Sequence, residues 1–141
     1  MASVPFHYVD LRAFSYGTED DECVERALRV YLPEDATVER AESEGHHGDR
    51  ICILSTRLEN ADDVRHILSQ VATLDDIETV REELVDRIDD NCSFFLTFDK
   101  QAACEGTVRR GDGITLRAKV EAYPATREGA IENARTALEA L

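Results

Sequence analysis

The most chemically distinctive stretch of the sequence is ESEGHHGDRICIL, from Glu42 to Leu54, in which two adjacent histidines stand between two glycines. Histidine is a common metal ligand and titrates near neutral pH, so His46 and His47 could bind zinc or act as acid and base. The backbone N–H groups of such a turn could instead hold a phosphate. Gly45 and Gly48 also fit a plain turn between two strands, because glycine accepts positive φ.

The surrounding sequence favours the plain turn over the two ligand sites. An apolar strand follows the second glycine, whereas phosphate cradles commonly precede a helix. Side chains adjacent in sequence rarely converge on one metal ion, and no complementary Cys/His pair stands at helpful spacing elsewhere. We therefore expect a hairpin turn that binds no metal and no cofactor, and that would contact a ligand only as part of a larger surface.

The rest of the chain carries no recognisable catalytic constellation. There is no Walker loop, no G-x-G-x-x-G, no G-x-S-x-G elbow and no H-E-x-x-H. Cys52 could be imagined as a nucleophile two residues after Arg50, but a cysteine inside the apolar run ICIL is more often buried. All four cysteines stand singly, which favours free thiols over a disulfide framework. We expect the protein not to be an enzyme.

The composition is far to the acidic side. The 141 residues include 30 Asp and Glu against 16 Lys and Arg, for a net charge of -14, and only two of the basic residues are lysines. Molar salt shortens the Debye length to about 3 Å and screens the self-repulsion of such a surface. An acid-rich, lysine-poor chain is therefore typical of a salt-loving cell, and we expect a halophilic protein.

One short window departs from this acidity. Residues 100 to 120 include five basic and two acidic residues, which gives a local charge of +3. Both lysines of the chain lie in this window. Arg117 and Lys119 alternate on one expected strand and share its outward face. A hairpin through Asp112-Gly113 could bring the preceding arginines beside them. The window is then either a patch balanced by neighbouring acids or a phosphate-contacting strip of the kind nucleic-acid binders carry. The basic residues of this window are Lys100, Arg109, Arg110, Arg117 and Lys119.

Periodicity predicts a single α+β domain over residues 1–141. Alternating or β-prone runs predict strands at 6–14, 38–43, 51–54, 93–98 and 114–123, with 107–110 as a further short strand pairing with the last one. Apolar stripes at helical spacing predict helices at 18–33, 60–71, 77–88 and 124–141. The expected order is β-α-β-β-α-α-β-β-(β)-α, a mixed and mostly antiparallel sheet with helices packed on one face. No signal peptide or membrane span is recognisable, so we expect a cytoplasmic protein without a membrane partner.

Four stretches together resemble a known family. They are YGTED, EGHHGDRI, RIDDNCSFFLTFDKQAACEG and ITLRAKVEAYPATREGAI. The combination is similar to the archaeal RNA-binding protein family described as a predicted exosome subunit, with a fold compared to double-stranded-RNA-binding domains and to the ribosomal protein that binds 5S rRNA. The resemblance covers about Phe6 to Ile131, with Asp49-Arg50 where the family pattern has a pair like Asn-Pro. Together with the acid-rich composition it implies a haloarchaeal source.

The resemblance implies a non-enzymatic RNA-binding protein in RNA processing or degradation, with structured or double-stranded RNA and exosome subunits as partners. Two alternatives stay open: a protein-interaction module of an RNA-processing assembly, and a small hydrolase that uses His46 and His47. Onto this sequence the family pattern carries Glu44 to Gly48 and Asp99 to Gln101. Donors such as histidine, glutamine and arginine suit the 2′-hydroxyls of A-form RNA. The expected RNA-contacting residues are Gly45, His46, His47, Gly48, Arg50, Lys100, Gln101, Arg109, Arg110, Arg117 and Lys119.

Overall fold

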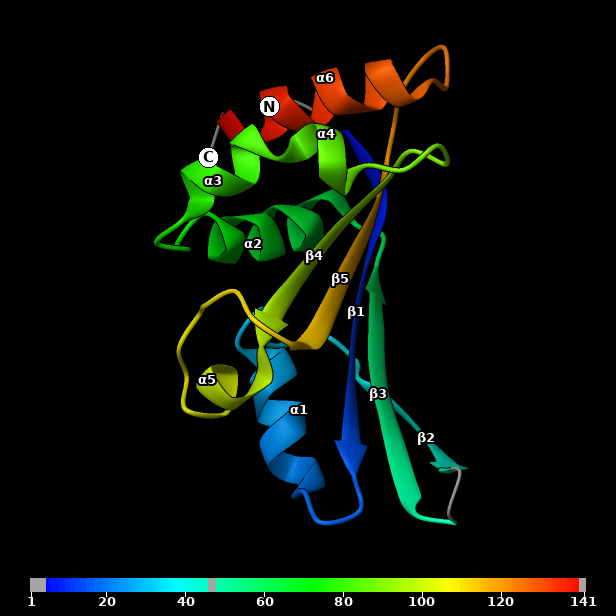
Figure 1. The fold of residues 1–141 in the computed structure, drawn as a ribbon, viewed down its shortest axis with the longest axis vertical. Coiled ribbons are helices and arrows are strands. Elements are labelled where there is room, and N and C mark those ends of the chain that lie inside the picture. The colour runs from blue at the N-terminus through cyan, green and yellow to red at the C-terminus, as the bar shows by residue number, and fades with distance from the viewer. Residues whose placement is uncertain (1–4, 46–47, 140–141) are drawn as a thin grey trace.

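The chain folds into one sheet with helices against one of its faces. The computed structural model describes residues 5–45 and 48–139. The five strands are antiparallel throughout, in the order β2-β3-β1-β5-β4 (Figure 1). In chain order the elements are β1 (Phe6–Tyr16), α1 (Asp21–Arg29), β2 (Glu39–Glu44), β3 (Arg50–Leu58), α2 (Ala61–Val71), α3 (Ile77–Glu82), α4 (Leu84–Arg87), β4 (Ser93–Asp99), α5 (Lys100–Cys104), β5 (Gly113–Val120) and α6 (Arg127–Glu139). The expected α+β class is confirmed.

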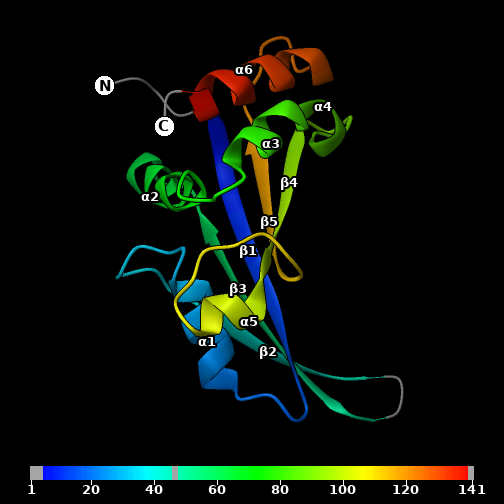
Figure 2. The ribbon, with the colours of Figure 1, turned by 60° about the vertical axis from the view of Figure 1, so that its left-hand side comes forward.

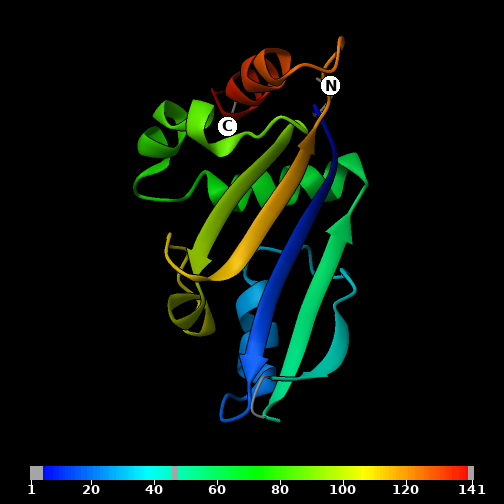
Figure 3. The same ribbon diagram turned by 45° about the vertical axis from the view of Figure 1, so that its right-hand side comes forward.

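Period-two alternation decides which face of the sheet is covered. In β1 the side chains of Val9, Leu11 and Ala13 are buried against the helices, while Asp10 and Arg12 point to the other side. The same alternation in β3, β4 and β5 places most of their apolar residues on the helical side. Figure 2 shows the helices gathered beside the sheet, and Figure 3 turns the uncovered face toward the viewer with the helices behind.

Aromatic stacking anchors the lower half of the core. The rings of Tyr31, just after α1, and Phe98, on β4, stack with their centroids 4.3 Å apart, and both side chains are fully buried. Phe95 lies on the same strand as Phe98 but points to the opposite face of the sheet and is 38% exposed. Side chains alternate between the two faces along a strand, so two phenylalanines three positions apart lie in different environments.

The first helix starts later than the sequence pattern indicates. A helix from residue 18 was expected, but the helix begins at Asp21. The N–H of Glu19 donates to the carbonyl of Tyr16 at 2.7 Å, so residues 16–19 form a turn. Asp20 then caps the helix, because its carboxylate accepts from the N–H of Glu22 at 3.0 Å.

Two further local expectations are wrong, and one helix was not predicted. The helix expected over residues 77–88 divides into α3 and α4, and α5 was not expected at all. The segment 107–110 does not pair with β5: Arg110 forms an isolated bridge with Phe98, and the carbonyl of Arg109 accepts from the N–H of Asp99. This segment therefore lies on the far side of β4, with a whole strand between it and β5.

Within the described ranges no helix is long and apolar enough to span a membrane.

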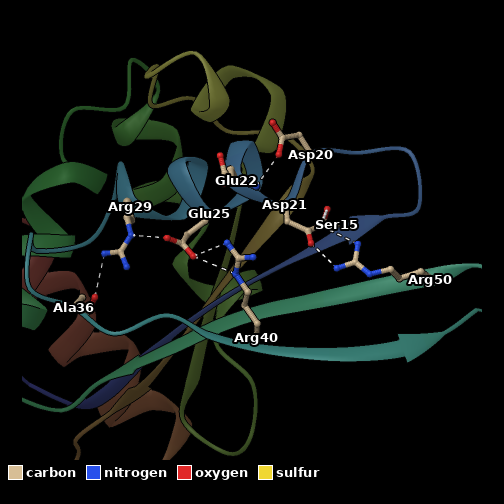
Figure 4. A network of polar contacts seen from close by, with 9 residues as sticks. All are labelled: Ser15, Asp20, Asp21, Glu22, Glu25, Arg29, Ala36, Arg40 and Arg50. Carbon is tan, nitrogen blue, oxygen red and sulfur yellow. Dashed lines mark hydrogen bonds and ion pairs between the residues drawn. The ribbon is translucent and has the colours of Figure 1, made fainter.

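Ion pairs attach the outer hairpin to α1. Glu25 and Asp21 lie one turn apart on the helix, and each receives an arginine from a strand (Figure 4). Arg40 of β2 donates to Glu25 at 2.9 Å, and Arg50 of β3 donates to Asp21 at 2.5 Å. Ser15 also donates to Asp21, at 2.7 Å. The hydrogen bonds from Arg50 and Ser15 lower the pKa of Asp21 from 3.8 to about 2.

Replacing Asp21 with Asn should lower the melting temperature at pH 7 in low salt, because the variant loses the charge that Arg50 pairs with. The pKa of Asp21 is lower in the folded state, so its charge stabilises the fold above about pH 4, and this contribution is lost as the pH falls toward 2. Calorimetry across this range should show the deficit of D21N shrinking below pH 4. The control is E22Q, in the same helical turn. An equal deficit at pH 2 and pH 7 would contradict the ion-pair explanation.

Replacing Phe98 with Ala should destabilise the protein by about 3 to 5 kcal/mol, because it empties a fully buried site and removes the partner of Tyr31. The matched variant F95A, on the same strand, should cost less than about 1 kcal/mol, because Phe95 faces solvent. Urea denaturation gives both free energies of unfolding. Similar losses in the two variants would show that the assigned faces of β4 are wrong.

Candidate nucleic-acid interface

The glycine turn closes the hairpin between β2 and β3. Glu44 and Arg50 are cross-strand partners, and the N–H of Gly45 donates to the carbonyl of Asp49 at 2.6 Å. Gly48 has φ +80°, which favours glycine, and its N–H donates to the carbonyl of Gly45. The turn interpretation is confirmed in the part that the structure describes. His46 and His47 lie outside the described residues, so their expected roles stay predictions.

Two basic residues expected at an RNA surface already form hydrogen bonds and ion pairs within the protein. The ammonium of Lys100 donates to the carbonyl of Phe14 and to Glu19, both at 2.8 Å, and its side chain is only 13% exposed. Arg110 pairs with Asp76, before α3, at 2.6 Å. These two residues fasten α5 and the segment after it to their neighbours.

The remaining members of the expected set are spread over the molecule. Arg50 bonds Asp21 and Glu42 beside α1. Arg109 pairs with Asp99 at 2.9 Å beyond the end of β4, and Gln101 is exposed on α5. The hairpin that was expected to bring Arg109 beside Arg117 does not form. The structure therefore does not gather the expected residues into one strip.

Arg117 and Lys119 do share the outward face of β5, and there they join residues that were not singled out from the sequence. The register places Lys119 opposite Tyr8 and Arg117 opposite Asp10 on one side and Phe95 on the other. All of them lie on the uncovered sheet face seen in Figure 3. We name this cluster the aromatic-basic patch; it consists of Tyr8, Asp10, Arg12, Arg57, Phe95, Arg117 and Lys119.

Asp10 holds the centre of the aromatic-basic patch. Its two carboxylate oxygens accept from Arg57 at 2.7 and 2.9 Å, and one of them also accepts from Arg117 at 3.1 Å. The guanidinium carbon of Arg57 lies 3.9 Å from the centroid of the Tyr8 ring. The hydrogen bonds that Arg57 donates to Asp10 raise the pKa of Arg57. Arg57 is thus fixed by a carboxylate along one edge and by an aromatic ring on one face.

The charge of the patch is opposite to that of the chain. Four basic residues surround one acid, which gives +3 on a protein of net charge -14. Within the described residues Arg12 has no acidic partner, and its guanidinium lies 5.5 Å from the Phe14 ring. One carboxylate cannot neutralise three arginines and a lysine. The patch is therefore a local cationic area with room for negative charge.

A hollow of about 860 Å³ lies over this face. One side of its lining comes from the patch, including Arg12, Phe95 and Arg117. The other side comes from residues that follow α1, residues that follow β3 and the first turn of α2, and it carries the acids Asp35, Glu39, Glu59 and Asp63. Because these acids repel phosphate, an anionic ligand is favoured on the side of the hollow that the aromatic-basic patch forms.

This arrangement can bind an anionic aromatic ligand. Guanidinium groups donate hydrogen bonds in a plane and stack on flat rings. An exposed phenylalanine adds an apolar surface of the same shape. Within residues 5–45 and 48–139 no group of three or more His, Cys, Asp or Glu could hold a metal ion.

The sequence contains only a weak sign of this patch. Phe95 is the aromatic residue at an outward position of SFFLTF, where a polar residue is more usual for a sheet covered on one face. The other members stand at outward positions of three separate strands and resemble ordinary solvated residues. They become one surface only through the strand order β3-β1-β5-β4.

Comparisons with known proteins show the family of the chain. The family model described as RNA binding matches residues 8–120, which include every member of the aromatic-basic patch. An RNA-binding protein of Pyrococcus abyssi is 31% identical over 144 residues, covering 94% of each chain.

Two solved structures share the fold. A DUF54 protein of Methanothermobacter thermautotrophicus is 42% identical with a TM-score of 0.78, over 94% of this chain and 98% of its own. A protein of Archaeoglobus fulgidus from the same family is 28% identical with a TM-score of 0.84, over 94% of this chain and 99% of its own. The chain therefore belongs to the archaeal RNA-binding family of DUF54 proteins.

Proposed function

We propose that this protein binds RNA through the uncovered face of its sheet, as a non-enzymatic component of RNA processing or degradation. The observation that carries the proposal is the gathering of Arg12, Arg57, Arg117 and Lys119 on one open face of a chain that is otherwise acidic. Family membership gives the class of ligand, and this face is the area where phosphates meet the least repulsion.

The acidic remainder of the surface directs RNA toward this face. A phosphate backbone is repelled by most of the molecule and attracted by the patch, so the negative charge helps to orient the ligand. In molar salt, ion pairing with phosphate contributes little. We infer a cytoplasmic protein of a salt-adapted archaeon, in which hydrogen bonding and ring contacts supply most of the affinity.

The wider role follows from the family resemblance. The protein is proposed to act beside exosome subunits and to recognise structured or double-stranded RNA by shape more than by sequence. The residues of the glycine turn, Gly45 to Arg50, remain a candidate second contact. Gly45 and Arg50 lie at the far end of the β2-β3 hairpin from Arg57, so a ligand that reached both this end and the patch would have to be extended along the sheet.

Replacing Arg12 and Lys119 together by Gln should weaken binding of a stem-loop RNA, because two phosphate-binding cations are lost without unpairing Asp10. The slope of log affinity against log potassium chloride should fall by roughly one for each contact removed. Filter binding between low and molar salt measures both quantities. Arg26, exposed on α1, and Arg135, half-buried on α6, provide the control when changed together to Gln.

The control pair carries the same change in net charge on the helical side, so it should leave the slope unchanged. Equal weakening by both pairs would mean that only overall charge matters and would refute the assigned face. Absence of RNA binding by the unaltered protein at every salt concentration would overturn the proposed function in favour of a protein-interaction module.

A further inference from the structure

We infer that the aromatic-basic patch binds unpaired nucleotides of RNA, with one base stacked on the ring of Phe95 and a second on the guanidinium plane of Arg57. This inference rests on the proposed function and specifies which part of an RNA occupies the site. It follows from the form of the two platforms, their spacing and the charges between them.

The first platform is the ring of Phe95. It stands on the uncovered face between Phe94 and Leu96, which are both buried on the other side. No helix covers this face in any of the three views (Figures 1 to 3). An exposed aromatic ring on an open sheet gives a flat apolar surface against which any base can stack.

The second platform is the guanidinium of Arg57. Tyr8 covers one of its faces at 3.9 Å, and the two hydrogen bonds to Asp10 occupy one edge. The side chain nevertheless stays 48% exposed, which leaves part of its surface free for a base to stack on. A guanidinium held in this way has already lost its rotational freedom, and a base that stacks on it has little further ordering cost.

The spacing of the platforms fits neighbouring nucleotides. Phe95, Arg117, Asp10 and Arg57 follow one another directly across β4, β5, β1 and β3. Three strand spacings separate the two platforms, or about 14 Å. Arg117 lies between them, where the phosphate linking two splayed bases would pass. Arg12 and Lys119 stand two residues along their strands and can pair with flanking phosphates.

Unpaired RNA fits this surface better than a duplex does. The faces of paired bases are covered by their neighbours inside the helix, and proteins reach A-form RNA mostly through phosphates and 2′-hydroxyls. Phe95 and the stacked Arg57 would gain nothing from such a helix. Unpaired loops and tails present free base faces, and stacking on them survives the salt that weakens phosphate contacts. A structured RNA would thus dock through its unpaired segment.

Fluorescence anisotropy with the full chain tests this inference, using a labelled twelve-nucleotide single strand and a blunt duplex of the same sequence in low and molar potassium chloride. The single strand should bind more tightly, and the difference should grow with salt. Replacing Phe95 with Ala should weaken single-strand binding by about fivefold to about a hundredfold without changing its salt slope, while F95Y should keep the affinity. Tyr123, which is fully exposed outside the patch, gives the control Y123A.

A probe within the RNA separates stacking from general weakening. A single strand carrying 2-aminopurine should lose fluorescence when bound to the unaltered protein and regain it with F95A, whose folding is checked by its melting temperature. Equal or tighter binding of the duplex, together with no effect of F95A, would overturn this inference and leave the proposed function standing. Failure of both RNAs to bind would overturn both.

Discussion

The alternation of side chains along β1 is the constraint on which the rest of the molecule depends. Val9 and Leu11 must face the helices to form the core, so Tyr8, Asp10 and Arg12 must face the opposite side. Since β1 is the middle strand of five, these outward residues lie at the centre of an open surface. The same alternation that builds the core therefore builds the candidate RNA interface.

Electrostatics divides the charged residues into two groups with different roles. One group stays within the helical side and holds elements together, as Asp21 and Glu25 do with two arginines of the β2-β3 hairpin. The other group lies on the open face, where Asp10 orients two arginines without neutralising the area. The presence of an arginine in this sequence therefore does not predict its role. Its bonding partner in the folded protein determines whether it stabilises the fold or is available to a ligand.

The sequence predicts the helices and strands better than it predicts which of them lie side by side. The outward Arg117 and Lys119 and the apolar stripe of α2 follow from periodicity alone. The helix α5 has only five residues, too few for an apolar stripe, and its sign is the cap formed by Asp99, which accepts from the N–H of Ala102. Pairing of residues 107–110 with β4 also escapes periodicity, because a turn signal does not reveal which strand a segment joins.

The candidate site was predictable only in part, because the sequence does not reveal which strands are neighbours in the sheet. A basic window in an acidic chain indicates a ligand surface, but Lys100 within it is used to fasten α5 to β1. The platforms at Phe95 and Arg57 come from strands about 40 residues apart in sequence, and strand order brings them to one face. No spacing rule within one stretch of sequence could have joined them.

The central claim is that RNA lies on the uncovered sheet face, and mapping of photocrosslinks by mass spectrometry tests it most directly. The full chain would be irradiated with an RNA bearing an unpaired segment in molar potassium chloride, then digested. We expect adducts on the peptides of β1 and β4, at Tyr8 and Phe95, and none on α2, α3 or α6. Adducts confined to the helical side, or to the turn at residues 44–50, would contradict the assignment.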